Sequence, residues 1–149
     1  MDSEENPGTA ADDFPCAGLT WKIIGCAMKV LNYYGPWYVE YVYQKALEHV
    51  FKKENVPFVA KTELPIFFEG EAIGATLMPD FLVDDTVIVE IKSLAKLTQK
   101  NRKQTLSYMK AANKEVGLLI NFGQGRLEWE RFVNTPAAKT EPAKTDLEK

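Results

Sequence analysis

The spacing of apolar residues changes three times along this chain, and these changes constrain its fold more than any other feature. Apolar side chains recur every three or four positions in two early segments, which predicts one helix from a Thr20 cap to Gly35-Pro36 and another from about Tyr38 to Lys53. Between residues 58 and 91 apolar residues occur at every second position, which is the period of a strand. The helical period returns over 98–113, and the strand period returns over 116–122 and 127–133. The sequence therefore predicts an α/β fold with the order ααββββαββ.

The four strands predicted between residues 58 and 91 form two pairs around short turns. The pairs and their turns are Phe58–Phe68 and Ala72–Leu77 around Glu69-Gly70-Glu71, and Asp80–Val83 and Val87–Ile91 around Asp84-Asp85. Two successive hairpins and a four-stranded meander both fit this pattern. A turn centred on residues 84–85 pairs positions whose numbers sum to about 170, so Asp80 is expected to face Glu90.

Length and composition indicate one domain with a polar tail at each end. A chain of 149 residues, 46% of them hydrophobic, can bury one sizeable core but hardly two. Residues 1–17 and 135–149 lack periodicity and are predicted to be disordered, which leaves 18–134 as the folded domain.

The same sequence features predict a cytoplasmic protein with no membrane partner. No apolar run approaches the roughly 20 residues that span a bilayer, and the first fifteen residues are acidic where a signal peptide is basic and then apolar. Cys16 and Cys26 have no metal-ligand spacing, so we expect reduced thiols and no zinc.

The distribution of charge favours an anionic partner despite a formal net charge of −3. The first fifteen residues hold five acids and no base, whereas residues 16–134 hold 15 bases against 13 acids. Between Glu90 and Glu115 the chain has no acid and seven bases, namely Lys92, Lys96, Lys100, Arg102, Lys103, Lys110 and Lys114. Such a run is usually a solvated helix face, but this one begins at the strand of Glu90, so we interpret it as a DNA-contacting surface.

Asp80, Glu90 and Lys92 introduce charge into otherwise apolar strands. The segments Met-Pro-Asp-Phe-Leu-Val and Val-Ile-Val-Glu-Ile-Lys would bury carboxylates, which is costly unless a metal or hydrogen bonds compensate. Glu90 and Lys92 share one strand face, with Asp80 opposite. Adjacent carboxylates without histidine or thiolate favour Mg²⁺ or Mn²⁺, and Lys92 would hold or polarise the water that attacks a phosphate. The alternative is a solvated cluster of cross-strand salt bridges.

The spacing Pro79-Asp80 … Glu90-Ile91-Lys92 resembles the PD-(D/E)xK motif of the restriction-endonuclease-like superfamily. Over about residues 19–134 the chain is also similar to the bacterial and archaeal GxxExxY proteins, a compact branch of that superfamily. The matching stretches are Leu19–Gly25, Gly35-Pro36 with Glu40–Tyr43, and Leu118–Gly123. The resemblance implies a mixed β-sheet flanked by helices, with a metal site at one edge that hydrolyses phosphodiester bonds, preferably in DNA.

The resemblance also assigns roles to individual residues. It makes Asp80 and Glu90 the main ligands of Mg²⁺ or Mn²⁺, adds Glu40 and the backbone carbonyl of Ile91 to the metal site, and makes Lys92 the catalytic lysine. From the residues alone, Glu40 is better explained as an exposed helical glutamate paired with a neighbour such as Gln44 or Lys45.

Gln104 and Tyr108, one turn apart on the third helix, are similar to the Gln-x-x-x-Tyr element of RecB-like nucleases. They are expected to contact DNA or to orient the active site. The other residues predicted to bind substrate are Lys96, Lys100, Arg102 and Lys103.

Two positions depart from the family pattern. Trp37 replaces the glycine of GxxExxY, so the turn before the second helix is expected to differ, and Asn101 stands where histidine is expected in many relatives. We interpret Trp21, Trp37 and Trp129 as packing residues in preference to platforms for bases, and assign His49 no role.

Three functions fit the sequence: a DNA nuclease, an RNA nuclease, and a non-catalytic module that keeps the fold and binds nucleic acid or protein. The presence of every expected acid favours an enzyme. A homodimer and delivery of substrate by a partner helicase are both compatible with the sequence.

Overall fold

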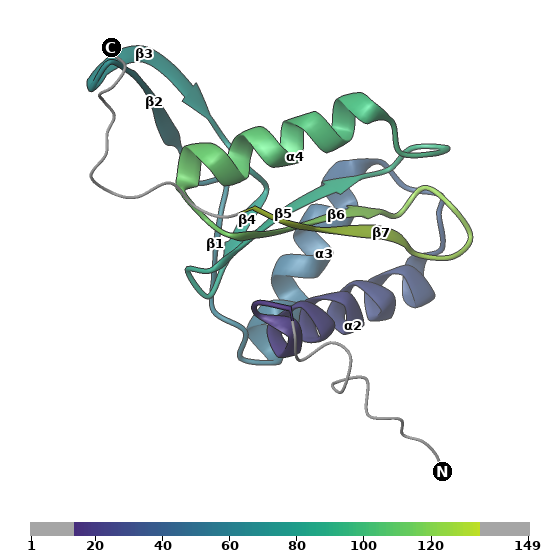
Figure 1. Ribbon diagram of the computed structural model, residues 1–149. Coiled ribbons are helices and arrows are strands. Elements are labelled where there is room, and N and C mark those ends of the chain that lie inside the picture. Colours follow the sequence, from purple (N-terminus) through teal and green to yellow (C-terminus); the bar gives the residue numbers. More distant parts are fainter. Residues whose placement is uncertain (1–13, 135–149) are drawn as a thin grey trace.

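A computed structural model describes residues 14–134 of the chain, which form a mixed five-stranded sheet, a separate hairpin and three helices (Figure 1). The elements are α2 (Ala17–Tyr34), α3 (Glu40–Lys53), β1 (Phe58–Ala60), β2 (Leu64–Phe68), β3 (Glu71–Leu77), β4 (Phe81–Val83), β5 (Val87–Lys92), α4 (Gln99–Ala112), β6 (Val116–Asn121) and β7 (Glu128–Val133). The sheet order is β1-β4-β5-β6-β7, and β2 pairs only with β3. Strands β5 and β6 are parallel and joined through α4, whereas the other neighbours are antiparallel.

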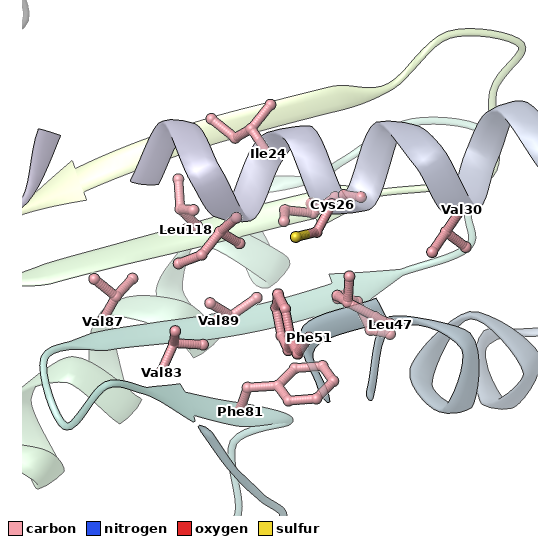
Figure 2. Close-up of a cluster of buried hydrophobic side chains, with 14 of the residues drawn as sticks. Ile24, Cys26, Val30, Leu47, Phe51, Phe81, Val83, Val87, Val89 and Leu118 are labelled. Carbon is pink, nitrogen blue, oxygen red and sulfur yellow. The ribbon is translucent and has the colours of Figure 1, made fainter. Parts of the chain in front are cut away.

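Helices cover both faces of the sheet, with α4 on one side and α2 on the other (Figure 1). The main core lies between the sheet and the pair α2 and α3, where side chains of β4, β5 and β6 contact those of both helices (Figure 2). Because successive strand residues point to opposite faces, Val87, Val89 and Ile91 of β5 enter this core. Each is fully buried, and their burial fixes the orientation of the whole strand.

The remaining β5 residues face α4. Ile88 packs with Tyr108 and Met109 of that helix, so strand alternation places Glu90 and Lys92 on the same side. Gly117 on the neighbouring strand β6 permits this close packing, because a Cβ there would lie 2.5 Å from Sδ of Met109. The packing between sheet and α4 thus brings the charged end of β5 under a helix.

The structure confirms the predicted α/β fold and corrects the strand count. Both predicted hairpins form, β2–β3 and β4–β5, and the pairs Phe81↔Val89 and Val83↔Val87 have the predicted register. The four-stranded meander is wrong. The segment predicted as one strand, 58–68, is two strands in different sheets, because Lys61 adopts a left-handed backbone conformation (φ 57°) just after β1.

The helix bounds differ from the predicted ones mainly at the N-terminal ends. Helix α2 begins at Ala17, within the segment predicted to be disordered, and Thr20 lies inside it and donates to the carbonyl of Ala17. Helix α4 has Thr98 as its cap, so the helix itself begins one residue after the start of the predicted segment 98–113. Of the predicted tails, residues 1–13 and 135–149 lie outside the described residues. No helix in the described part of the chain is long and apolar enough to cross a membrane.

Candidate active site

Asp80 and Glu90 meet at the point where β4 begins and β5 approaches its end. Glu90 Oε1 accepts a hydrogen bond from the Asp80 backbone N–H (3.1 Å), and Asp80 Oδ2 accepts one from the Ile91 N–H (2.8 Å). The two residues are only 2% and 4% exposed. The sequence-based register therefore placed these residues opposite each other correctly, although their chemical role stays a prediction.

Burial and mutual repulsion govern the protonation of these acids. Loss of solvent, followed by the charge of Asp80, raises the pKa of Glu90 to about 8, while the backbone hydrogen bond from Asp80 and the charge of Lys92 act in the opposite direction. Burial and then Asp80 also raise the pKa of Glu40, the first residue of α3. Glu40 therefore lies within range of the charge on Asp80, although it comes from a different element.

Two lysines supply positive charge to the carboxylates. Lys92 is largely buried and its Nζ lies 3.9 Å from Oε2 of Glu90, while Lys61 Nζ lies 2.6 Å from Oδ1 of Asp80. Burial lowers the pKa of Lys61, but the hydrogen bond to Asp80 and the nearby acids outweigh this effect and raise it overall. Lys61 is not predicted from the sequence, because nothing in its local pattern indicates that the turn after β1 returns to Asp80.

The donor set fits a divalent cation, although the side chains are not gathered into a closed cage. Within residues 14–134, no three carboxylate, histidine or thiolate groups are close enough together to form a complete metal site. Lys61 and Lys92 only partly neutralise the two buried carboxylates, since the pKa of Glu90 stays raised, and a hard cation such as Mg²⁺ would supply further positive charge. The N–H and carbonyl of one strand residue point to the same side, so the Ile91 carbonyl faces Asp80 as its N–H does.

Gln44 of α3 is a second residue that the sequence analysis did not assign to the site. It lies one helical turn after Glu40 and is 4% exposed. Its Nε2 donates to Glu48 (3.0 Å) and to the backbone carbonyl of Asp80 (3.4 Å), whereas its Oε1 has no hydrogen-bond donor among the described residues. A buried acceptor without a donor, on a side chain that contacts the Asp80 backbone, is a further feature that suits a bound cation or its water.

Helix α4 brings Tyr108 to the carboxylates. Tyr108 is 8% exposed, and burial followed by the charges of Glu90 and Asp80 raises its pKa. A side-chain hydrogen bond with Gln104 lowers this pKa, so Gln104 and Tyr108 are neighbours. Asn101, by contrast, completes the helix cap: its Oδ1 accepts from the Thr98 N–H (2.9 Å).

The bases predicted to bind substrate occupy different surroundings. Arg102 donates two hydrogen bonds to the carboxylate of Glu130 on β7, from Nε to Oε1 (2.8 Å) and from Nη2 to Oε2 (2.8 Å). Arg102 is two residues, or about 200° of helical turn, from Gln104 and so lies on the opposite side of α4. The ion pair engages its guanidinium, whereas Lys96, Lys100 and Lys103 are exposed.

Asn121 and Gly123 fix the chain that follows Lys92. The Asn121 amide accepts from the Leu94 N–H (2.8 Å) and donates to the Leu94 carbonyl (2.9 Å) and to Glu128 (2.9 Å). A Cβ at Gly123 would overlap the backbone of Leu94, so only glycine permits this approach. These contacts give a physical reason for the Asn-Phe-Gly sequence at 121–123.

Comparisons with known proteins place this chain among nucleases. No protein with a curated description matches it significantly. Among solved structures, an alkaline exonuclease from Laribacter hongkongensis is similar, with a TM-score of 0.43 and 14% sequence identity over 58% of this chain and 51% of that one. The chain therefore spans about half the length of that exonuclease. The model of the PD-(D/E)XK nuclease superfamily matches residues 17–132, most of the chain, so this protein belongs to the PD-(D/E)XK nuclease superfamily.

Proposed function

We propose that this protein is a metal-dependent nuclease of the cytoplasm that hydrolyses phosphodiester bonds in DNA, and that it belongs to the GxxExxY branch of its superfamily. One observation carries the proposal: Asp80 and Glu90 are buried side by side at the end of a strand, with Lys92 on the same face. Such a cluster is destabilising for a protein with no use for it, because buried like charges repel.

We assign each residue a role that is consistent with its position. Asp80 and Glu90 would hold Mg²⁺ or Mn²⁺, with the Ile91 carbonyl and Glu40 as further donors. When bound, the cation supplies charge stabilisation for the phosphate oxygens and lowers the pKa of a water ligand. Lys92 is placed to orient the attacking water and to neutralise the phosphate.

Helix α4 supplies the substrate-facing wall of this site. Tyr108 and Gln104 are placed to contact the scissile nucleotide or to hold the carboxylates in position. Lys96, Lys100 and Lys103 are exposed around them and would attract the phosphate backbone. Arg102 is better explained by its ion pair with Glu130 than by substrate binding.

The decisive experiment measures Mg²⁺ and Mn²⁺ binding by calorimetry and cleavage of DNA and RNA by gel assay. Wild type is compared with Asp80→Ala and Glu90→Ala, and with Asp85→Ala as a matched control, because Asp85 is a highly exposed acid in the turn between the same strands. We expect both site variants to lose metal binding and at least about 100-fold in cleavage rate, and the control to retain both.

Two results would contradict the proposal. Metal-independent binding of nucleic acid with no cleavage would identify a non-catalytic module instead. Cleavage confined to RNA would leave the chemistry intact but reject DNA as substrate.

A further inference from the structure

Exposed aromatic side chains gather where α2 ends and α3 begins. Tyr33 and Trp37 are each 83% exposed, Tyr41 is 67% exposed and Tyr38 is 46% exposed. Trp37 is interpreted from the sequence as a packing residue, but most of it meets solvent, and its indole lies close to Gly35, where an added Cβ would lie 3.0 Å from the ring. Large aromatic rings are usually covered, so a group of uncovered ones marks a binding surface.

Two of these rings, Tyr33 and Tyr41, also line a groove between α2 and α3. The groove has a volume of about 890 Å³ and is lined by Tyr33, Tyr34 and Tyr41 together with Lys29, Lys45 and Lys53. Glu54 is the one acid among its lining residues, and it pairs with Lys22 and Lys29. The groove is therefore aromatic and carries a net positive charge, which suits an anionic ligand with flat apolar faces.

The groove is connected to the candidate active site through the segment that joins the two helices. Tyr34 and Tyr38 pack edge to face with ring centroids 5.0 Å apart. The Tyr38 carbonyl accepts a hydrogen bond from Ser93 Oγ (2.9 Å), the residue directly after Lys92. Glu40 and Tyr41 are consecutive, so α3 presents one to the carboxylates and the other to the groove.

We propose that this aromatic groove binds an unpaired nucleic-acid strand and directs it to the carboxylates; the proposal rests on the proposed nuclease function and names its substrate class as single-stranded. Unpaired bases expose flat faces that stack on tyrosine and tryptophan, and lysines beside the rings contact the phosphates. A duplex hides these faces in its own stack, so the rings would contribute little to binding it. Every base has a flat π-face that can stack on these rings, so binding should be tolerant of sequence.

The test measures binding of the full-length protein to a fluorescein-labelled 20-mer of thymidine and to a 20-base-pair duplex by anisotropy, in EDTA so that neither is cut. We expect wild type to prefer the single strand at least about tenfold. Trp37→Ala and Tyr41→Ala should each weaken single-strand binding at least about fivefold, with duplex binding changed less than about twofold.

Matched controls separate stacking from folding and from charge. Phe68→Ala removes a similarly exposed ring (64%) from the β2–β3 hairpin and should leave both affinities unchanged. Trp37→Phe should restore most of the affinity lost in Trp37→Ala. The dependence of affinity on salt should be the same in the aromatic variants and shallower in Lys53→Gln, because only the latter loses a charge.

Equal affinity for single strand and duplex, or aromatic variants that bind like wild type, would overturn the proposal. A variant that becomes monomeric while its single-strand affinity is unchanged would also overturn it, by assigning the rings to self-association. Cleavage in Mg²⁺ is measured on the same preparations. Metal-dependent cleavage without preference for single strands would reject only the proposal that the groove binds a single strand. Binding of a single strand through the rings without cleavage would reject only the nuclease function.

Discussion

At the residue scale, every polar group of Asp80 has a hydrogen-bonding partner. Its N–H donates to Glu90, its carbonyl accepts from the Lys61 N–H (3.1 Å) and from Gln44, and its two carboxylate oxygens accept from Lys61 Nζ and the Ile91 N–H. These contacts fix the backbone and the carboxylate of Asp80 in one orientation.

Of these contacts, the Lys61 ammonium is the one that a metal would have to compete with. It occupies Oδ1 of Asp80 at 2.6 Å and its side chain is 49% exposed, so it is free to move away. We infer that Lys61 neutralises Asp80 before metal binds and can then turn to a substrate phosphate. The ion pair thus stabilises the empty site at some cost in metal affinity.

Replacing Lys61 by methionine should therefore separate metal binding from turnover. We expect Lys61→Met to bind Mg²⁺ about fivefold more tightly, which corresponds to the ~1 kcal/mol of a partly exposed ion pair, and to cleave more slowly at saturating metal. Calorimetry and initial rates measure the two effects. Lys114→Met, which breaks the Lys114–Asp85 pair (3.3 Å), is the matched control and should change neither. An unchanged Mg²⁺ affinity in Lys61→Met would show that the ammonium does not compete.

At the scale of elements, the positions of β5 and α4 depend on close backbone contacts that involve glycine. The chain leaves β5 at Lys92, is bound by Asn121 through Leu94, and enters α4 at the Thr98 cap. The site side chains lie on both sides of this connection, Glu90 before it and Tyr108 after it. A displacement of the connection should therefore alter the distance between the two halves of the site.

Gly123→Ala is expected to produce such a displacement. A Cβ at Gly123 would collide with backbone atoms of Leu94, which cannot rotate away as a side chain does. We expect a loss of roughly 1–3 kcal/mol in the free energy of unfolding, together with a fall in cleavage rate. Denaturant unfolding and kinetics test this, with Gly125→Ala as control because its Cβ would meet nothing within 4 Å. Equal stability of the two variants would contradict the role assigned to the contact.

The sequence predicted those parts of the site that depend on local pattern. Alternation along β5 and the short turn at 84–85 determine that Glu90 faces Asp80, and both can be read without a structure. Lys61 and Gln44 could not be found in this way, because Lys61 reaches Asp80 through a left-handed turn and Gln44 through the packing of α3. The split of 58–68 was missed for the same reason: its alternation continues across the turn, while its hydrogen-bonding partners change.

At the scale of the whole molecule, the site lies where separately packed parts meet. The core under α2 and α3 fixes one face of β5, and α4 covers the other, so the burial of Glu90 follows from two hydrophobic contacts on opposite sides of one strand. The protein therefore keeps its acids in place by means of packing that is otherwise favourable. The cost is electrostatic, and it should be visible in the stability of the whole domain.

Metal-free protein should accordingly lose stability as pH rises. The pKa of Glu90 is raised in the folded state from an ordinary 4.5 to about 8, so the folded protein holds a proton that the unfolded chain releases. Protonated Glu90 therefore contributes its full stabilisation below pH 4.5, and this stabilisation is lost as pH increases through about 8. Calorimetric melting temperatures should fall over this interval in EDTA, and Glu90→Gln, which keeps an acceptor for the Asp80 N–H but no charge, should flatten the decline.

Mg²⁺ at about 100 times its Kd should add ~2.7 kcal/mol to the free energy of unfolding of wild type near pH 8 and nothing to that of Glu90→Gln. A wild-type melting temperature that is independent of pH, or a Glu90→Gln variant that Mg²⁺ stabilises equally, would show that Glu90 does not link protonation, metal binding and folding.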